Sequence, residues 1–208
     1  MSDADQIPQL YLITPPAPDL ALFPGLLSAC MDAVPVACLR LALAGRDEDT
    51  ILRAADACRE AAHARDVAIV IESHVGFVER LGLDGVHLTD GARSVRQVRK
   101  DLGGDAIIGT ACGQSRHDGM TAGEIGADYV SFGPLGQTGL GDGRVAELEL
   151  FQWWSQMIEV PVVAEGALSE DLVRAVAPFA DFLAFGEEIW SAPDPVATLR
   201  RMHKAMGG

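Results

Sequence analysis

Short apolar runs alternate with segments of helical periodicity along almost the whole chain. Runs of three to six residues rich in Val, Ile, Leu and Ala are typical of strands that are buried on both faces. Such strands are predicted at Gln9–Ile13, Val36–Leu41, Ala68–Ile71, Gly85–Leu88, Ala106–Thr110, Tyr129–Phe132, Val162–Ala164 and Phe182–Phe185.

The segments between these runs have the spacing of amphipathic helices. The clearest is Asp47–Arg65, where Ile51, Ala55, Cys58 and Ala62 fall on one face and acidic residues open the segment, as the helix dipole favours. Further helices are predicted at Pro24–Met31, His74–Leu81, Ser94–Leu102, Ser115–Gly126, Ala146–Ile158, Asp171–Ala177 and Pro193–Met206.

The regular alternation of strands and helices predicts a parallel sheet with helical crossovers. Two architectures share this pattern, an open doubly wound sheet and a closed barrel. Eight strand–helix units in 208 residues favour closure. The first strand is also not followed by the G-x-G-x-x-G of dinucleotide-binding sheets. We therefore predict an α/β protein made of one (β/α)8 TIM-barrel domain, residues 1–208.

Charge and cysteine usage narrow the class of partner. Acidic residues outnumber basic ones, 30 to 16, for a formal net charge of −14, which disfavours binding to nucleic-acid phosphates. No apolar run approaches the roughly 18 residues of a membrane span. Residues 1–6 lack the basic and apolar regions of a secretory signal, and the four cysteines form no C-x-x-C pair. We expect a cytoplasmic protein with reduced thiols and a small-molecule ligand, without a nucleic-acid or membrane partner.

Polar residues gather at the carboxyl ends of the predicted strands, where barrels of this type bind their ligands. Arg40 ends the second strand, and its guanidinium suits either an anion clamp or a structural ion pair with a rim carboxylate. The other candidates at these ends are Glu72, His74, Asp90, Cys112, Gln114, Ser115, Gln137, Thr138, Glu165, Gly166, Gly186, Glu187 and Glu188.

Several of these candidates have two interpretations. Glu72, His74 and Asp90 allow a divalent metal site or an acid/base set, but they match no metal-ligand spacing, which favours solvated rim charges. His87 lies within an apolar strand, as a hydrogen-bonded core histidine does. Cys112 is either a nucleophile or an inert thiol, and the sequence around it favours the inert thiol.

Two further features lie near the predicted rim and on a predicted helix. Residues 133–143 contain five glycines, which permit the backbone angles and hinge motion of a lid. Trp153 and Trp154 are adjacent on one helix, so at most one faces the core. The other tryptophan is a candidate subunit contact in a homo-oligomer.

A series of short motifs has the order found in a known family. Leu10-Tyr11-Leu12-Ile13-Thr14 opens the chain, and Leu39-Arg40 ends the second strand. Then follow Gly85-Val86-His87-Leu88, Ile107-Ile108-Gly109, Gly126-Ala127-Asp128-Tyr129-Val130, Gly133-Pro134 with Thr138, and Pro161-Val162-Val163-Ala164. From about Leu10 to about Ile189 the chain resembles the thiamine phosphate synthase (thiamine-phosphate pyrophosphorylase) family, which includes thiazole tautomerase relatives.

This resemblance implies a TIM barrel that joins an aminopyrimidine pyrophosphate to a thiazole phosphate, with Mg²⁺ and release of pyrophosphate. Ionisation of the pyrimidine would give a cation that the thiazole nitrogen attacks. Such chemistry needs positive charge on the departing pyrophosphate.

The chain departs from the family pattern at the groups that hold phosphate and magnesium. The Gln-Leu-Arg-Glu-Lys of the second strand reads 38–42 Cys-Leu-Arg-Leu-Ala here, which keeps Arg40 and loses the lysine. Asn-Asp after the third strand becomes Glu72-Ser73. The second magnesium aspartate is replaced by Ala92, with Asp90 two residues earlier, and the lid keeps Thr138 but loses its lysine.

The later loops depart in a way that adds negative charge. The phosphate-cradling Gly-Gly after the seventh strand becomes Gly166-Ala167 with Glu165 before it, and the serine after the eighth strand becomes Glu187 beside Glu188. Two unit charges about 4 Å apart repel by roughly 4 kcal/mol at an effective dielectric near 20. The position of the catalytic histidine of the tautomerase relatives is Pro134 here.

Three functions remain open at this point. The first is a diverged enzyme of this family in thiamine biosynthesis, with Arg40, Glu72, His74 and Thr138 catalytic and Asp90 as the ligand of a Mg²⁺ cofactor. Its substrate-binding residues would be Arg40, Cys112, Gln137, Thr138, Glu165, Gly166, Gly186 and Glu187. The second is a catalytically degenerate paralogue that binds a thiamine-related compound or a partner protein. The third is a structural interaction protein with no pocket ligand.

Overall fold

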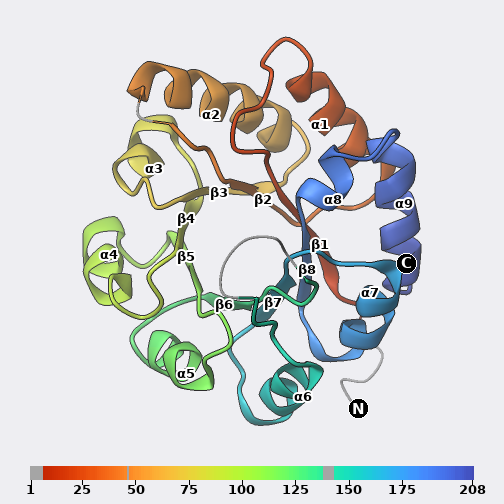
Figure 1. Cartoon of the computed structure of the whole chain (residues 1–208). Helices are drawn as coiled ribbons and strands as arrows, with labels where there is room; N and C mark the ends of the chain where they lie inside the picture. The colour runs from red at the N-terminus through yellow and green to blue at the C-terminus, as the bar shows by residue number, and fades with distance from the viewer. Residues whose placement is uncertain (1–6, 46, 138–142) are drawn as a thin grey trace.

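Parallel strands β1 to β8 close into a barrel in the computed structural model, which describes residues 7–45, 47–137 and 143–208 (Figure 1). The strands follow one another around the barrel in sequence order, and β1 closes the ring by pairing with β8, Tyr11 opposite Ala184. Their bounds are β1 Gln9–Ile13, β2 Cys38–Leu41, β3 Ala68–Glu72, β4 Gly85–Leu88, β5 Ile107–Ala111, β6 Tyr129–Phe132, β7 Val162–Glu165 and β8 Phe182–Phe185. The predicted closed barrel is confirmed.

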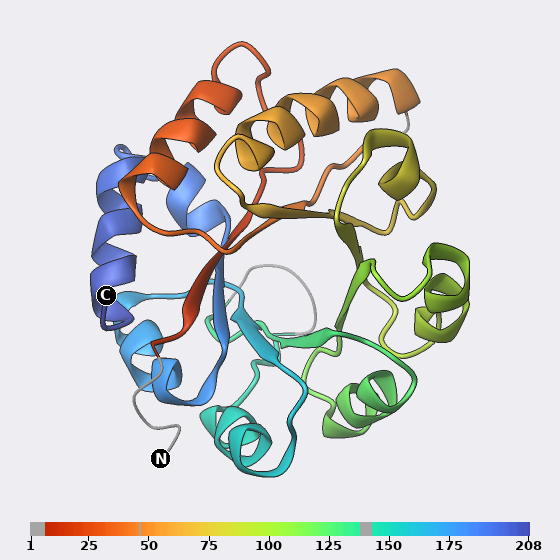
Figure 2. The same cartoon turned by 180° about the vertical axis from the view of Figure 1, so that it is seen from behind.

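Helices surround the strands on the outside, as Figures 1 and 2 show from opposite ends. They are α1 Phe23–Ala33, α2 Glu48–His63, α3 Gly76–Leu81, α4 Val95–Leu102, α5 Arg116–Glu124, α6 Leu148–Met157, α7 Glu170–Val176, α8 Glu187–Trp190 and α9 Pro195–Ala205, with a 3-10 turn at Ala177–Phe179. Helix α8 was not predicted, because a single turn of four residues is too short for a periodic pattern. In the part of the chain described here, no helix has both the length and the apolar character needed to cross a bilayer.

Several helices begin where a polar side chain caps the first turn. Asp47, Ser115, Ser169 and Asp194 each accept a hydrogen bond from the amide three residues later. Such a bond satisfies one of the free N–H groups at the start of a helix. These caps explain why α2 and α5 begin one residue after the predicted start.

The apolar core has two parts. The larger part lies between the strands and the helices, and the smaller lies inside the barrel. On α6, Trp154 is 1% exposed and packs edge-on against Phe132, with ring centroids 4.9 Å apart. Its neighbour Trp153 is half-buried, and the Arg116 guanidinium lies 4.8 Å from its ring centroid. Trp154 is therefore the buried member of the pair, and Trp153, which is partly buried, packs against the same core.

Candidate active site

A column of hydrogen-bonded polar side chains runs through the barrel interior. Arg40 on β2 lies with Nη1 2.7 Å from Nε2 of His87 on β4. His87 Nδ1 lies 2.9 Å from the hydroxyl of Tyr129 on β6, which lies 2.9 Å from the hydroxyl of Tyr11 on β1. Barrel interiors are usually filled by branched apolar side chains, so this column is a departure from the ordinary pattern.

Glycine makes room for the column. Gly109 on β5 pairs with Tyr129 in the parallel register, and a Cβ at Gly109 would lie 1.9 Å from Cζ of the Tyr129 ring. No side-chain rotation of a small residue relieves so close an approach, because Cβ is fixed by the backbone. The glycine of the Ile-Ile-Gly motif thus has a packing role, since it lets the tyrosine ring cross the barrel.

The column ends in an ion pair at the carboxyl ends of the strands. Arg40 Nη2 lies 2.6 Å from Oε2 of Glu165, the last residue of β7. The Ser131 hydroxyl on β6 donates to Glu165 Oε1 at 2.9 Å. The side chains of Arg40 and Glu165 are 9% and 17% exposed, so the pair is largely shielded from solvent. We call Tyr11, Tyr129, His87, Arg40, Glu165 and Ser131 the interior column.

The hydrogen bonds of the column determine the tautomer of His87. A guanidinium only donates, so His87 Nε2 accepts from Arg40 and the ring proton lies on Nδ1, where it is donated to Tyr129. Burial, together with the charge of Arg40, holds the pKa of His87 well below its ordinary value. The imidazole is therefore neutral. Burial alone would lower the pKa of Arg40, but Glu165 and the tyrosines raise it and the net direction is upward, so the guanidinium stays charged.

Two further carboxyl groups lie near the ion pair. Burial raises the pKa of Glu72 at the end of β3, where Arg40 lowers it and Glu165 raises it. Burial also raises the pKa of Glu188 on α8, although its carboxylate accepts bonds from the amides of Leu168 and Gly186. The carboxyl ends of the strands therefore hold three acidic groups near one another, with Glu72 and Glu165 close to the Arg40 guanidinium, and protonation of Glu72 and Glu188 is favoured relative to exposed carboxyls.

The loops after β6 and β7 are packed closely against each other beside Glu165. The amide of Leu135 donates to the carbonyl oxygens of Glu165 and Gly166, at 3.1 and 3.2 Å. A Cβ on Gly133 would lie 2.4 Å from the Glu165 carbonyl oxygen, and one on Gly166, whose φ is +92°, would lie 2.6 Å from Pro134 Cβ. The backbone that carries Glu165 is consequently held in place by a neighbouring loop.

Several predicted site residues lie at the rim without joining the interior column. His74 donates from Nδ1 to the Glu72 carbonyl oxygen at 2.8 Å, and its ring stacks on Phe77. Asp90 is exposed and accepts a bond from Ser94 at 2.6 Å. Gln137 and Glu187 are exposed.

The remaining predicted residues are buried or fall outside the described chain. Cys112 is buried, and burial raises the pKa of its thiol to about 12, in line with an inert thiol. Gly186 donates its amide to Glu188. Thr138 and the rest of 138–142, within the predicted lid at 133–143, lie outside the described residues.

The structure adds functional candidates that sequence reasoning missed. These are Tyr11, Tyr129 and Ser131, which belong to the interior column. Of the two predicted glutamates of α8, Glu188 is half-buried and Glu187 is exposed. A signal was present for the first three, because polar side chains at alternate positions of an apolar strand share one face. Nothing in the pair of glutamates at 187–188 shows which of them points inward.

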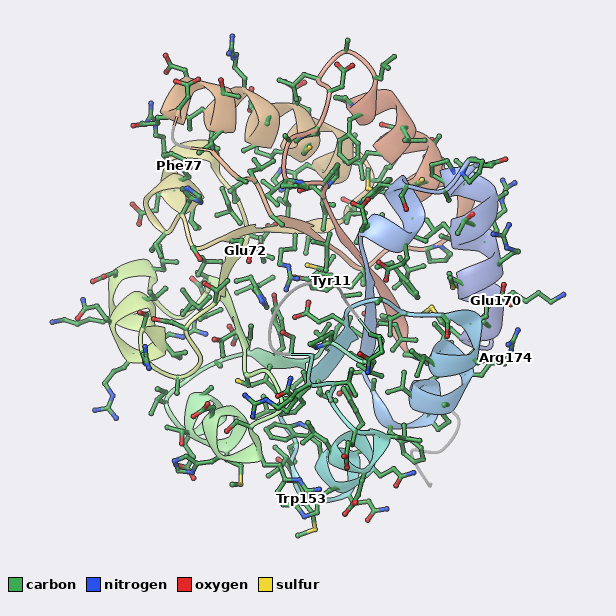
Figure 3. The ribbon with its side chains drawn as sticks, in the orientation of Figure 1. Tyr11, Glu72, Phe77, Trp153, Glu170 and Arg174 are labelled. Carbon is green, nitrogen blue, oxygen red and sulfur yellow. The ribbon has the colours of Figure 1, made fainter. Side chains whose placement is uncertain are left out.

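Figure 3 shows Tyr11 and Glu72 at the barrel, whereas Phe77, Trp153 and the Glu170–Arg174 pair lie among the outer helices. Within the described residues, no three His, Cys, Asp or Glu side chains gather into a group able to hold a metal ion. The described side chains therefore do not form a ready Mg²⁺ site by themselves.

Comparison with known proteins agrees with this fold. The family model described as thiamine monophosphate synthase matches residues 10–189. The thiamine-phosphate synthase of Rhodospirillum centenum is 41% identical over 96% of this chain and 98% of its own length. That of Erythrobacter litoralis is 36% identical over 95% of each chain.

Solved structures show the same architecture. The thiamine phosphate pyrophosphorylase of Pyrococcus furiosus superposes with a TM-score of 0.81 at 21% identity, over 96% of this chain and 95% of that one. An orotidine 5'-phosphate decarboxylase from Pyrococcus horikoshii shares the barrel at a TM-score of 0.68 and 14% identity, over 95% of this chain and 99% of that one. With a matching family model and close relatives along nearly its whole length, this chain belongs to the thiamine monophosphate synthase family.

Proposed function

We propose that this chain is a diverged enzyme of thiamine biosynthesis that joins an aminopyrimidine pyrophosphate to a thiazole phosphate. Relatives 36% and 41% identical along nearly their full lengths are named thiamine-phosphate synthases, which supports the reaction class. The observation that carries the proposal is the set of half-buried acidic groups at the barrel mouth, where Glu165 is paired with Arg40 and Glu72 and Glu188 lie near enough to interact with Glu165.

This set of groups suits an aminopyrimidine. The amino group and ring nitrogens of such a heterocycle offer donors and acceptors side by side, which a carboxyl group matches with its two oxygens. Glu72 is the best placed, because it is half-buried at the end of β3 and forms no ion pair with a described side chain. Burial raises the pKa of Glu72, which favours its protonated form relative to an exposed carboxyl.

The same groups suit the charge that develops in the reaction. The bond between the pyrimidine methylene carbon and the pyrophosphate oxygen breaks, and both electrons leave with the pyrophosphate. The lone pair of the thiazole nitrogen then forms the new carbon–nitrogen bond. Carboxylates of Glu72 and Glu165 near the cationic carbon would stabilise it electrostatically.

The leaving group has weaker support. Arg40 is already paired with Glu165, and the family's lysines are absent from the second strand and the lid. Because the described residues form no metal cluster, we assign no step to Mg²⁺. Departure of pyrophosphate should therefore be slow.

A second candidate function is ligand binding without catalysis, and the Arg40–Glu165 ion pair favours it. Neutralisation of Arg40 by Glu165 would weaken the hold on pyrophosphate without weakening contacts to an uncharged thiamine-related heterocycle. This candidate predicts binding of the aminopyrimidine with no turnover.

One assay separates the two candidates. Purified protein is incubated with both phosphorylated substrates and Mg²⁺, and thiamine phosphate and pyrophosphate are quantified together. We expect equal amounts of both products at turnover below about 1 per second, the lower end of ordinary enzymes. Turnover at that rate or faster would contradict the weakened pyrophosphate site, and no product at all would favour the binding function.

Thermal shift measurements test the ligand class directly. A ligand that binds only the folded state raises the melting temperature with its concentration. We expect the unphosphorylated aminopyrimidine alcohol to raise the melting temperature of the wild type, and Glu72→Gln to reduce that rise. Glu159→Gln, at an exposed position before β7 and away from the site, serves as the charge-matched control. If the aminopyrimidine alcohol does not raise the melting temperature of the wild type, both candidate functions are contradicted.

A further inference from the structure

We propose that the amino-terminal end of the barrel holds a binding site for a small, neutral apolar molecule of the size of a single benzene ring. The site is a cavity of about 160 Å³ near the starts of the strands, at the other end of the barrel from the Arg40–Glu165 pair. Its lining residues are Gln9, Tyr11, Ala37, Cys38, Ala68, Ile107, Tyr129, Val163 and Phe182. None of the acidic groups assigned to the proposed reaction lines it, so the two proposals are independent.

The cavity exists because three neighbouring strands begin with small residues that face the barrel interior. Cys38 and Gly85 lie two positions before Arg40 and His87 of the interior column and therefore share their inward face. Ala68, the first residue of β3, packs against the apolar cluster inside the barrel. Barrel interiors are usually filled by bulky branched side chains. The small residues on β2, β3 and β4 leave a space that the described side chains do not fill.

The cavity is closed at its inner end and open to solvent at the other. The inner wall is formed by side chains that are at most 7% exposed, namely Tyr11, Cys38, Tyr129 and Val163. Tyr11 lies at the barrel in Figure 3. The rim is formed by the partly exposed Ala37, Ala68, Ile107 and Phe182, together with the exposed Gln9. A small ligand can therefore enter from solvent while the strands stay paired.

The lining offers little to water or to an ion. The hydroxyls of Tyr11 and Tyr129 are bonded to each other at 2.9 Å, and that of Tyr129 also bonds to His87. Apart from them, the polar side-chain groups among the described lining residues are the Cys38 thiol and the Gln9 amide, and no lining side chain there is charged. A water molecule held in a cavity needs about two to four polar partners, whereas apolar cavities stay dry and bind apolar molecules. The lining therefore favours a neutral apolar occupant.

The size and chemistry of the lining favour an aromatic ring. An apolar protein cavity of about 150 Å³ lined by Leu, Ile and Phe binds benzene or xenon, and the volume here is similar. Phe182, Tyr11 and Tyr129 offer ring surfaces, against which another ring packs edge-on or with an offset. The sulfur of Cys38 adds a polarisable contact of the kind that aromatic rings favour. A monocyclic aromatic compound therefore matches the cavity in volume and in contacts.

Thermal unfolding of the full chain with benzene tests the ligand class. A ligand that binds only the folded state raises the melting temperature with its concentration. We expect a rise of about 3–5 °C when benzene is present at about ten times its dissociation constant. Benzoate has the same ring with a carboxylate that meets no cation in the described lining, so it should give no rise. Absence of a rise with benzene, or an equal rise with benzoate, overturns the proposal.

A matched pair of variants tests whether benzene binds in this cavity. Ala68→Leu adds three carbons to the lining and should abolish the benzene-dependent rise. Ala29→Leu makes the same change at an exposed position of α1 and should keep the full rise. If Ala68→Leu folds and shows the same rise as the wild type, benzene binds elsewhere and the proposal is wrong.

Xenon locates the site in the wild type without any substitution, so the proposal stays testable if Ala68→Leu does not fold. Crystals of the full chain are exposed to xenon under pressure, and we expect a xenon atom between the Tyr129 and Phe182 rings. Ordered water in the cavity without xenon, or xenon bound only elsewhere, overturns the proposal. Neither xenon nor benzene is a thiamine precursor, so failure here leaves the proposed function untouched, and absence of turnover leaves the cavity untouched.

Discussion

His87 lies in the middle of an apolar strand, and both of its ring nitrogens are hydrogen-bonded there. A buried imidazole with two partners is held in one tautomer, and in this case the partners require the proton on Nδ1. His87 thus holds Nη1 of Arg40 in place from inside the barrel.

The neutral state of His87 gives stability a definite dependence on pH. Its pKa is depressed in the folded state, so the unfolded chain binds more protons once the pH falls below about 6.5. The free energy of unfolding should therefore be unaffected by His87 above that pH and should fall on acidification, by at most about 1.4 kcal/mol per pH unit. Glu72 and Glu188 act in the opposite sense, because burial raises their pKa values in the folded state. Their contribution to the free energy of unfolding should fall as the pH rises above about 4.5.

Comparison with His87→Gln isolates the histidine contribution. Urea unfolding at pH 7.5 and 5.5 should show a smaller loss of stability on acidification in His87→Gln than in the wild type. Ring ¹⁵N shifts of labelled wild type should also show the neutral Nδ1–H form at both pH values. A protonated ring at pH 5.5 in the folded protein would contradict the assignment.

The cysteines offer a second test at the residue scale. All four are buried, and burial raises the pKa of Cys38, Cys58 and Cys112 to about 12 and that of Cys30 to about 11. The reactive thiolate is scarce in such sites. We expect no rapid reaction with a disulfide reagent at pH 7.5 in the native protein and reaction of all four thiols in denaturant. Rapid native labelling mapped to Cys112 would instead support the nucleophile interpretation.

At the scale of elements, an aspartate just before each of three strands accepts a hydrogen bond from the backbone of the preceding strand. Asp84, Asp128 and Asp181 precede β4, β6 and β8 and accept bonds from the amides of Ile69, Ile108 and Val162, each at 2.7 Å. In each case the aspartate lies one residue before its strand and accepts from an amide at the start of the preceding strand. The barrel therefore repeats a two-strand unit. The second strand has Ala37 at the corresponding position.

Removal of one of these aspartates should weaken the start of a strand. Asp181→Ala removes the side-chain acceptor of the Val162 amide. Because Val162 is fully buried, this change should cost about 1–2 kcal/mol of unfolding free energy. Asp181→Asn, which keeps an oxygen acceptor, should cost less. Chemical denaturation measures both, with exposed Asp105→Ala as the matched control. An equal effect of Asp105→Ala would show that the bond itself contributes nothing.

At the scale of the whole molecule, the barrel closes around an interior that side chains from several strands must fill together. Tyr129 occupies the space that Gly109 leaves, and its hydroxyl ties β6 to β1 and β4. Crowding a filled core typically costs about 1–3 kcal/mol. Gly109→Ala should therefore cost at least that much, because the added carbon would overlap the Tyr129 ring.

A double-mutant cycle tests whether this clash is the cause. Gly109→Ala should cost much less when it is made in a Tyr129→Leu background than in the wild type. Gly104→Ala, at an exposed glycine with open space around its missing Cβ, is the control and should be near neutral. The same cost of Gly109→Ala in both backgrounds would place the strain elsewhere.

The fold was predictable because strand and helix patterns are local. All eight predicted strands are present, with ends that differ by up to two residues, as at β2, which begins at Cys38 rather than Val36. The family could also be identified from the sequence, because its motifs are short local stretches that follow one another in a fixed order along residues 10–189. The site was predictable only in outline, because Arg40, Glu72 and Glu165 could be placed at one rim but not paired.

The sequence by itself determined the alternation of elements, the closed barrel and the gathering of polar residues at the strand ends, because each depends on periodicity within a short stretch of chain. The tertiary structure alone showed that Arg40 pairs with Glu165, since Glu165 is 125 residues away and reaches it only when β2 and β7 face the same interior. It also showed that Glu188 is half-buried and Glu187 exposed, because one turn of helix points only one of two neighbours inward. Contacts between distant strands depend on barrel closure, and no local pattern encodes them.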